Sequence, residues 1–285
     1  MKQLLDIYQT ILDTGTQQAN RTGIDTLMIP GAMMRFDLRE GFPAVTTKQL
    51  AFKPVKGELI AFLRGYTNAA KFRDLGCKIW DPNANKNEAW LANPNRKGED
   101  DLGRVYGAQW VDWKISETES INQVQDVLDK LKNNPTDRRM IINAWRPDEF
   151  KEMALPPCHV LYQFLADTKN RVLHLCMYQR SCDMFLGVPF NIASASLFLS
   201  IIAKLSGFTA GTFTHFLADA HIYVNHLDQV KEQLSRTPYE LPKLNISFEG
   251  LDSTNYYNWA FNIQPDHFTL ENYQFHPSIK AEMAV

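Results

Sequence analysis

The chain has 285 residues, of which 45 % are hydrophobic, so it can form one large domain or two small ones with a sizeable core. It has 30 basic and 32 acidic residues, and this formal net charge of −2 argues against a general nucleic-acid or membrane surface. Any anion that the protein binds must therefore be held by a few placed cations.

The first part of the chain predicts two helices and a strand. Apolar residues recur at helical spacing over residues 1–13, so we expect a helix there that ends at Gly15. Alternating apolar and charged residues at 34–38 predict a half-buried strand. A second helix is expected over residues 54–65, because proline is favoured at the start of a helix and glycine at its end.

The middle of the chain contains one break in composition. Residues 83–101 are rich in Asn, Lys, Glu and Gly, which predicts an exposed insertion. Ser120 to Gln123 fits a capping box that opens a helix, and Asn134 followed by proline is expected to close it.

The second half predicts strands first and helices later. Residues 139–190 read as strand-rich, with a turn at 167–170. A largely apolar helix is expected over 193–205, followed by Gly207, and its wide apolar face implies burial on most sides. A later helix around 227–234 precedes a strand at 244–248.

These elements mix without strict strand–helix alternation, which predicts one α/β domain of the α+β type over residues 1–285, with a mixed sheet flanked by helices.

The cysteines and the N-terminus bear on location. Four cysteines in a chain of this length, without a CxxC pair, favour a reducing compartment over a disulfide scaffold. The first helix lacks the apolar core of a signal peptide, and no run approaches the roughly 18 apolar residues of a membrane span. We expect a cytoplasmic protein, and no metal site, because no ligand spacing indicates one.

Cys158 is the first candidate for chemistry. It follows Pro156 and Pro157, which hold the chain extended, and it precedes an apparent strand. Such a cysteine can face a pocket and act as a nucleophile if nearby positive charge favours its thiolate. The alternative is an inert buried cysteine, which is the common case.

Arginines supply candidates for that charge. Arg21, Arg138, Arg139 and Arg180 could hold a phosphate with their planar forks, or could be ordinary surface charge. Arg180 differs from the others because it is the first of several polar residues inside an otherwise apolar run. A charge that is buried there needs a hydrogen-bonded or oppositely charged partner.

Three further groups are consistent with proton work or ligand contact. His221 and Tyr223 are two residues apart, so a strand would place both on one face. Glu58 lies on a mostly apolar helix and could have a raised pKa, unless it points outward. Trp80 could stack on a flat ligand or belong to the core. The inventory fits covalent catalysis on a small phosphorylated molecule.

A series of motifs then resembles one family over nearly the whole chain. In chain order they are residues 21–23 (RTG), 46–48 (TTK), 79–81 (IWD), 106–107 (YG), 137–139 (DRR), 154–159 (ALPPCH), 178–183 (YQRSCD), 187–194 (GVPFNIAS), 219–223 (DAHIY) and 283–285 (MAV). This pattern resembles the thymidylate synthase family. The resemblance implies reductive methylation of dUMP to dTMP, with 5,10-methylenetetrahydrofolate as carbon donor and reductant and dihydrofolate as product.

The resemblance also implies a role for each matching residue. Cys158 is expected to add to C6 of the uracil ring, with Glu58 and Tyr106 managing protons and Arg180, Asp183 and Asn191 completing the catalytic set. The expected dUMP contacts are Arg21, Arg138, Arg139, Gln179, Arg180, Ser181, Asp183, Asn191, His221 and Tyr223. The expected folate contacts are Trp80, Asp183, Leu186, Gly187, Phe190 and Ala284.

The resemblance further implies a homodimer, in which Arg138 and Arg139 reach into the partner's site. The chain departs from the usual family pattern at Gln49, where a basic residue is common. It also departs at Arg104 and Arg146, where Pro and Asn are more usual.

Three other functions remain as alternatives. A dUMP or dCMP hydroxymethylase could use the same cysteine and folate, although Asn191 argues against a cytosine base. A thiol hydrolase could pair Cys158 with His159 or His221. A nucleotide-binding protein without catalysis would need no nucleophile, whereas Cys158 is present.

Overall fold

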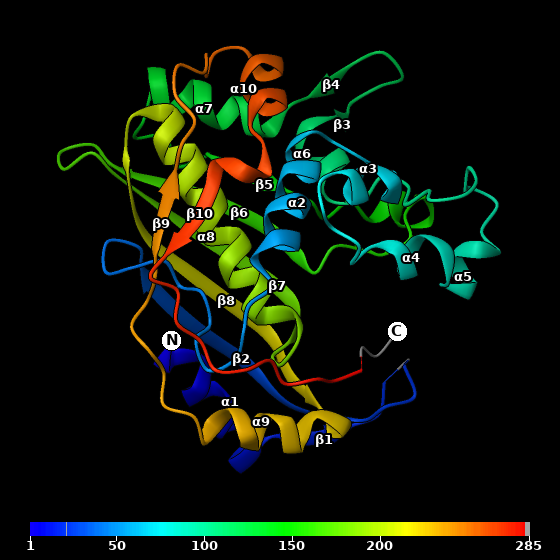
Figure 1. Cartoon of the computed structure of the whole chain (residues 1–285). Helices are drawn as coiled ribbons and strands as arrows, with labels where there is room; N and C mark the ends of the chain where they lie inside the picture. Colours follow the sequence, from blue (N-terminus) through cyan, green and yellow to red (C-terminus); the bar gives the residue numbers. More distant parts are fainter. Residues whose placement is uncertain (21, 283–285) are drawn as a thin grey trace.

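A six-stranded sheet forms the centre of the computed structural model, which describes residues 1–20 and 22–282 (Figure 1). In spatial order its strands are β1 (Thr16–Gln18), β2 (Thr26–Asp37), β8 (Thr209–Tyr223), β7 (Val172–Asp183), β6 (His159–Asp167) and β5 (Ile141–Asn143). The pair β7–β8 is parallel and the other neighbours are antiparallel. The predicted mixed sheet is therefore confirmed.

Helices and two small two-stranded sheets accompany this sheet. The helices are α1 (Lys2–Thr14), α2 (Phe52–Leu63), α3 (Ala69–Asp74), α4 (Asp81–Asn85), α5 (Glu88–Leu91), α6 (Gly107–Val111), α7 (Gln123–Asn133), α8 (Gly187–Ser206), α9 (Leu227–Leu234) and α10 (Tyr256–Asn262). Short 3-10 turns are η1 (Pro147–Glu152), η2 (Val224–His226) and η3 (Pro265–His267). The small sheets pair β3 (Trp113–Lys114) with β4 (Ser120–Ile121), and β9 (Lys243–Ile246) with β10 (Phe268–Glu271).

Helix α8 covers one face of the central sheet (Figure 1). It begins at Gly187, earlier than the predicted Ala193, so Phe190 and Asn191 lie on a helix and the expectation of strands up to residue 190 was wrong. Gly207 ends the helix as predicted, with a left-handed φ of 71° that favours glycine.

Helix α8 also corrects the expectation that the chain has no apolar run long enough to span a membrane. By length and mean hydropathy α8 could cross a membrane, although our sequence reading found no such stretch. However, 78 % of its apolar window is buried inside the protein, as in the central helix of a folded core.

The opposite face of the sheet is open and apolar. Met33 on β2, Tyr178 on β7 and Phe216 on β8 are 53 %, 42 % and 39 % exposed. Ile141 on the edge strand β5 is 40 % exposed. Large apolar side chains gathered on one sheet face are typical of an interaction surface.

Most of the other local predictions are confirmed, but the predicted capping box is wrong. Helix α1 ends at Gly15, α2 spans most of the predicted range, and α7 ends at Asn133. The predicted capping box does not form, because Ser120 pairs in the β3–β4 hairpin. Asn122 caps α7 instead, and its side-chain oxygen accepts a 2.9 Å hydrogen bond from the backbone N–H of Gln125.

Segment 83–101 contains α5 and the end of α4. Most of its residues are exposed or half-exposed, but Ala84 and Trp90 are buried. The Trp90 indole N–H donates to the Asp101 carbonyl at 2.7 Å, and Asp100 accepts two hydrogen bonds from Arg73. The Trp90 bond is internal to the segment, whereas the Arg73 bonds fix the segment against the body of the protein.

Candidate active site

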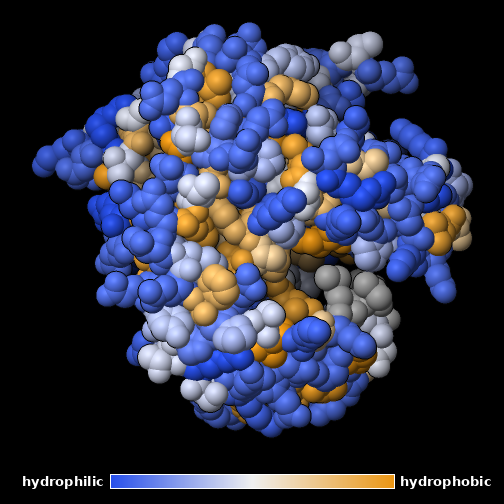
Figure 2. Space-filling view, in the orientation of Figure 1, coloured by the Kyte–Doolittle hydropathy of each residue, from blue (hydrophilic) through white to orange (hydrophobic). Residues whose placement is uncertain are grey.

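Sheet topology brings three distant motifs to one place. Strand β6 is antiparallel to β7, so His159, next to Cys158, pairs with Gln179 near the end of β7. Strand β8 is parallel to β7, so Asp183 at the end of β7 pairs with His221. On this side the molecular surface is hollowed between the part carrying α2 and α4 and the part carrying α1 and α9 (Figure 2).

Cys158 is half-buried and held by its backbone. Its N–H donates a 2.6 Å hydrogen bond to the hydroxyl oxygen of Tyr106, a buried residue at the start of α6. Its carbonyl accepts from the backbone N–H of Arg180 at 2.9 Å. Burial, with the nearby Cys158 as a second cause, raises the pKa of Tyr106 well above its usual value, so its hydroxyl stays protonated.

The Arg180 guanidinium binds the backbone of the segment that precedes Cys158. Its Nε donates to the Pro157 carbonyl at 2.8 Å and its Nη2 to the Pro156 carbonyl at 3.0 Å. The guanidinium also lies over the Trp145 ring, 5.3 Å from its centroid. The structure therefore places a fixed positive charge beside Cys158, which is the environment that a reactive thiol needs.

A buried network fixes the side chain of Asn191. Its Oδ1 accepts a 3.0 Å hydrogen bond from Nε2 of Gln179, while Gln179 Oε1 lies 2.8 Å from Nε2 of His215. Burial lowers the pKa of His215 well below its usual value, so the ring is neutral and its Nε2 carries the donated proton. This chain of bonds determines which end of each amide is donor and which is acceptor.

His159 is not placed to act as a base for Cys158. Its side chain is buried, and its Nδ1 lies 3.2 Å from the hydroxyl of Tyr162. Burial lowers the pKa of His159 to about 4, against the opposing effect of a hydrogen bond with Asn191. A thiol hydrolase that pairs Cys158 with His159 finds no support in this arrangement.

Glu58 and Trp80 form a pair. The indole N–H of Trp80 donates to Glu58 Oε1 at 2.8 Å. Burial raises the pKa of Glu58 to about 7, although this hydrogen bond opposes the shift. Glu58 is therefore poised to exchange a proton near neutral pH. Trp80 is only 5 % exposed and packs edge-on against Phe62 and Tyr106.

The turn between β7 and α8 carries the residues expected to contact a second ligand. Asp183 Oδ1 accepts hydrogen bonds from the backbone N–H groups of Phe185 and Leu186, at 3.1 and 3.2 Å. Leu186, Gly187 and Phe190 follow, and all three are half-buried. The carboxylate of Asp183 thus shapes the entry into α8.

His221 and Tyr223 lie together at the end of β8, as their spacing predicts. Their rings are 5.3 Å apart and nearly perpendicular. Nδ1 of His221 is 3.1 Å from Oδ1 of Asp219, which orients the imidazole. Ser181 on β7 pairs with Asp219 in the sheet, so the polar ends of these two strands are contiguous.

Arg138 and Arg139 lie apart from this cluster, on the exposed connection between α7 and β5. Arg139 is 83 % exposed in its side chain and pairs with Asp137 at 2.9 Å. Within the described residues, neither arginine side chain makes a hydrogen bond or ion pair with the other expected site residues. Arg21 and Ala284, both expected in the site, lie outside the described residues.

Two residues of this region were not predicted as site residues. Lys48 is buried, its Nζ donates to the Phe185 carbonyl at 2.5 Å, and burial lowers its pKa to about 8. His215 supports Gln179 as described above. Lys48 belongs to the TTK motif at 46–48, but no role was assigned to it, and a histidine in a long strand carries no sequence signal that distinguishes it from a core residue.

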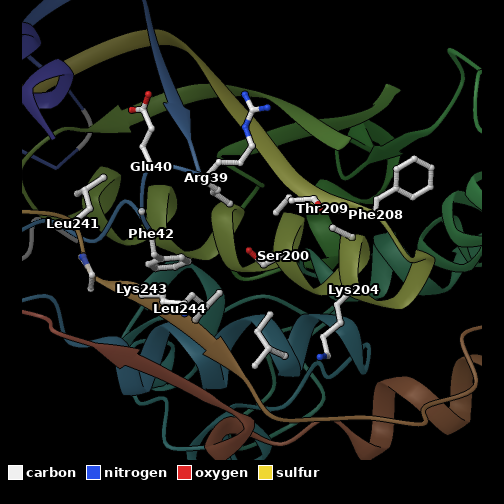
Figure 3. A pocket seen from close by; sticks show the side chains of 16 residues that line it. Arg39, Glu40, Phe42, Ser200, Lys204, Phe208, Thr209, Leu241, Lys243 and Leu244 are labelled. Carbon is white, nitrogen blue, oxygen red and sulfur yellow. The ribbon is translucent and has the colours of Figure 1, made fainter. Parts of the chain in front are cut away.

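A further cavity lies away from these residues. This cavity of about 570 Å³ lies between the turn after β2, the C-terminal half of α8 and β9 (Figure 3). Arg39, Glu40, Phe42 and Ser200 are among the residues that line it. None of the described residues that line it belongs to the predicted site. In the described part of the chain, no cluster of three His, Cys, Asp or Glu side chains could hold a metal.

Comparison with known proteins gives a consistent result. The model of the family described as "Thymidylate synthase" matches residues 2–285. The chain is 45 % identical to proteins named thymidylate synthase from Pseudomonas syringae pv. tomato and from Pseudomonas putida, and it is 40 % identical to one from Listeria monocytogenes. Each of these alignments covers 100 % of both chains.

Proposed function

The chain belongs to the thymidylate synthase family and is a methyltransferase, and we propose that Cys158 is the nucleophile with which it methylates dUMP. The reaction takes the one-carbon unit and the reducing hydride from 5,10-methylenetetrahydrofolate and gives dTMP and dihydrofolate. The residue assignment is supported by the hydrogen bonds that hold the backbone around Cys158. The Tyr106 hydroxyl oxygen accepts from the Cys158 N–H, and the Arg180 guanidinium donates to the carbonyls of Pro156 and Pro157. We call these bonds the clamp on Cys158.

In this proposal the clamp acts on the first step. The Cys158 thiolate adds to C6 of the uracil ring, which makes C5 nucleophilic toward the methylene carbon. The Arg180 charge favours the thiolate, and the backbone bonds hold the sulfur in one orientation toward the base.

We assign dUMP recognition to the polar ends of β7 and β8. Arg180 and Ser181 bind the phosphate, together with Arg21. His221 and Tyr223, whose rings touch, bind the deoxyribose hydroxyl. Asn191 reads the uracil edge, and support comes from the bond that Gln179 donates to its Oδ1, because this bond leaves the amide N–H groups to meet a carbonyl oxygen of the base.

We assign proton transfer to Glu58 and Tyr106. Glu58 has a pKa near 7 because of burial, so it can both release and accept a proton at neutral pH. Tyr106 keeps its proton and therefore acts as a hydrogen-bond partner rather than as a base.

We assign folate binding to the half-buried rim formed by Leu186, Gly187 and Phe190, with Trp80 and Asp183 beside it and Ala284 from the C-terminus. The rim offers apolar surface next to the Asp183 carboxylate, which suits a flat, polar-edged ring. The Trp80 bond to Glu58 connects this folate side to the proton-transfer group.

We propose that the working unit is a homodimer built on the open face of the sheet. Met33, Tyr178 and Phe216 form an exposed apolar surface opposite α8, and a second copy of the chain would cover it. Arg138 and Arg139 are exposed near the β5 edge and contact none of the other described site residues in their own chain. A partner's phosphate site gives these two cations a ligand.

We propose a cytoplasmic location, since the four cysteines are present as thiols rather than disulfides. We also propose that residues 1–285 form a single domain, because the buried residues join into one hydrophobic core cluster. The relatives named above are thymidylate synthases, so the hydroxymethylase alternative gains no support from them.

The test is the product formed from dUMP and 5,10-methylenetetrahydrofolate. The expected outcome is dTMP with an equal amount of dihydrofolate, and no product from the Cys158→Ala variant. Hydroxymethyl-dUMP with tetrahydrofolate would contradict the hydride step. Normal turnover by Cys158→Ala, with its fold verified, would contradict the covalent mechanism.

A further inference from the structure

Outside the catalytic cluster, two arginine side chains bind the same buried carboxylate. Nε of Arg104 lies 2.7 Å from Oε2 of Glu149, and Nε of Arg146 lies 3.2 Å from its Oε1. Glu149 is 8 % exposed, and the side-chain amide of Gln109 also donates to its Oε2 at 2.6 Å. A buried carboxylate is tolerated because it has several hydrogen-bonded partners, and such an arrangement is rigid.

Each chain of contacts that starts at this carboxylate is called an arm, and the first arm leads through Arg104 to Tyr106. Arg104 donates through Nη2 to the Asp112 carbonyl at 2.6 Å, and its backbone N–H donates to the Glu152 carbonyl at 3.0 Å. Gly103 lies so close to this segment that an added Cβ would be 1.9 Å from the Glu152 oxygen. The loop that carries Tyr106 is therefore joined to the segment that leads to Cys158.

The second arm leads to Arg180. Nη1 of Arg146 donates to the Lys114 carbonyl at 2.6 Å, and its guanidinium lies 4.9 Å from the centroid of the Trp113 ring. The preceding residue, Trp145, supports the Arg180 guanidinium and packs on Phe150, with ring centroids 4.6 Å apart. Holding Arg146 in place therefore also holds the adjacent Trp145, whose ring packs against the Arg180 guanidinium.

We propose that Glu149 is a positioning residue for Cys158, acting through Arg104 on the Tyr106 side and through Arg146 on the Arg180 side. Both arms end on the same short segment, because Tyr106 binds the Cys158 N–H and Arg180 binds the carbonyls of Pro156 and Pro157. The inference rests on the proposed role of Cys158 as the nucleophile.

The physical basis is the sensitivity of a reacting group to small displacements. Replacing Glu149 by Gln removes the buried charge that both arginines share, so that Arg104 keeps only Asp112 and Arg146 only Asp148 as ion-pair partners, each at 3.2 Å. A displacement of about 1 Å at a reacting atom can lower a rate by roughly 100-fold. Loss of one arm alone is expected to have a smaller effect than loss of the carboxylate that joins both.

The experiment compares Glu149→Gln and Arg146→Gln with wild type, using turnover and the alkylation of Cys158 by iodoacetamide across pH in protein without substrate. We expect kcat to fall by at least about 10-fold in E149Q and by a smaller factor in R146Q. Alkylation is expected to slow at neutral pH, and its pH profile is expected to move to higher pH, because Arg180 is less well held. A purely structural role for Glu149 lowers the melting temperature but leaves this profile in place.

Arg171→Gln is the matched control. Arg171 also donates to backbone carbonyls, those of Ser206 and Gly207, and its guanidinium lies 3.9 Å from the Phe208 ring centroid, at the far end of α8. This variant is expected to keep the wild-type rate and alkylation profile.

The outcomes separate the two proposals. Wild-type turnover and alkylation in folded E149Q and R146Q overturn the positioning role, and R146Q decides alone if E149Q does not fold. If alkylation of Cys158 leaves wild-type turnover intact, the nucleophile assignment fails instead.

Discussion

The backbone N–H of Cys158 donates a 2.6 Å hydrogen bond to the hydroxyl oxygen of Tyr106. Tyr106 is buried and its ring stacks on Phe62, with centroids 4.9 Å apart, so the acceptor is held rigidly. The bond joins the turn before β6 to the start of α6, two segments that are far apart in sequence. It orients the candidate nucleophile through its backbone.

Replacing Tyr106 by Phe removes this acceptor and leaves the Cys158 N–H without it. We expect kcat to fall by about 10- to 100-fold, and the free energy of unfolding to fall by about 1–2 kcal/mol. Enzyme kinetics and urea unfolding measure the two effects.

Tyr273→Phe is the matched control for that variant. The Tyr273 hydroxyl also accepts a backbone N–H, from Leu50 at 2.8 Å, but it lies outside the catalytic cluster. This control is expected to lose stability and keep kcat. An equal loss of kcat in both variants would contradict a specific role for Tyr106.

Glu58 predicts a pH dependence of both stability and rate. Its pKa is raised from 4.5 to about 7 by burial, so the folded state keeps a proton that the unfolded chain releases. The free energy of unfolding is therefore expected to fall as pH rises from 4.5 to 7, by at most about 3 kcal/mol, and less where water reaches the half-buried side chain.

Glu58→Gln removes the titrating group and should flatten that part of the stability curve. The pH–rate profile should also lose its inflection near 7, and kcat should fall by about 100-fold or more. Chemical unfolding at several pH values and the pH–rate profile are the measurements. A Gln variant with an unchanged rate profile would exclude Glu58 as the proton-transfer group.

Asn191 is expected to set the choice of base. In the Asn191→Asp variant the amide N–H donors are replaced by a carboxylate oxygen, which suits the amino group of cytosine better than the carbonyl of uracil. We expect kcat/KM for dCMP relative to dUMP to rise by about 10-fold or more. An unchanged ratio, measured with both nucleotides under the same conditions, argues that another group reads the base.

The proposed dimer predicts complementation between inactive subunits. Arg138→Ala and Cys158→Ala homodimers should each be weak or inactive, whereas their mixture should recover part of the wild-type activity, because one mixed site is intact. The measurement is turnover after subunit exchange, with exchange verified by mass spectrometry of tagged subunits.

Met33→Asp provides a second test of the same proposal. Its side chain is 53 % exposed on the open sheet face, so the charge should weaken a dimer more than the fold. Sedimentation at several concentrations reports the assembly state. A wild-type protein that remains monomeric at working concentrations contradicts the shared site.

Gly103 predicts a local cost in stability. Its φ of 65° favours glycine, and an added Cβ would be 1.9 Å from the Glu152 carbonyl oxygen. Gly103→Ala should lower the free energy of unfolding by on the order of 4 kcal/mol, as measured by urea unfolding.

Gly250→Ala is the control, because Gly250 has a similar φ of 67° but open space around it. Its expected cost is roughly 1–2 kcal/mol, the backbone term alone. Equal losses in the two variants would show that the close approach at Gly103 is unimportant.

Local patterns in the sequence are sufficient for many of the elements. Apolar spacing located α1 and α9, a proline and a glycine located α2, and Gly15 and Gly207 marked helix ends, because these signals depend on neighbouring residues. The start of α8 was missed, although Pro189 lies in its first turn, where proline is well tolerated. The cap at Asn122 was not predicted, because Ser120, which was expected to cap the helix, pairs in the β3–β4 hairpin instead.

The mixed α/β class and, through the ordered motifs, the family follow from the amino-acid sequence alone. How the candidate residues meet follows from the folded chain: Cys158 is held between Tyr106 and Arg180, His159 lies against Tyr162, and Gln179 fixes Asn191. The reason is physical. Periodicity and turn chemistry act between close neighbours along the chain, whereas hydrogen-bond partners, burial and the pKa shifts that burial causes depend on segments that strand pairing brings together.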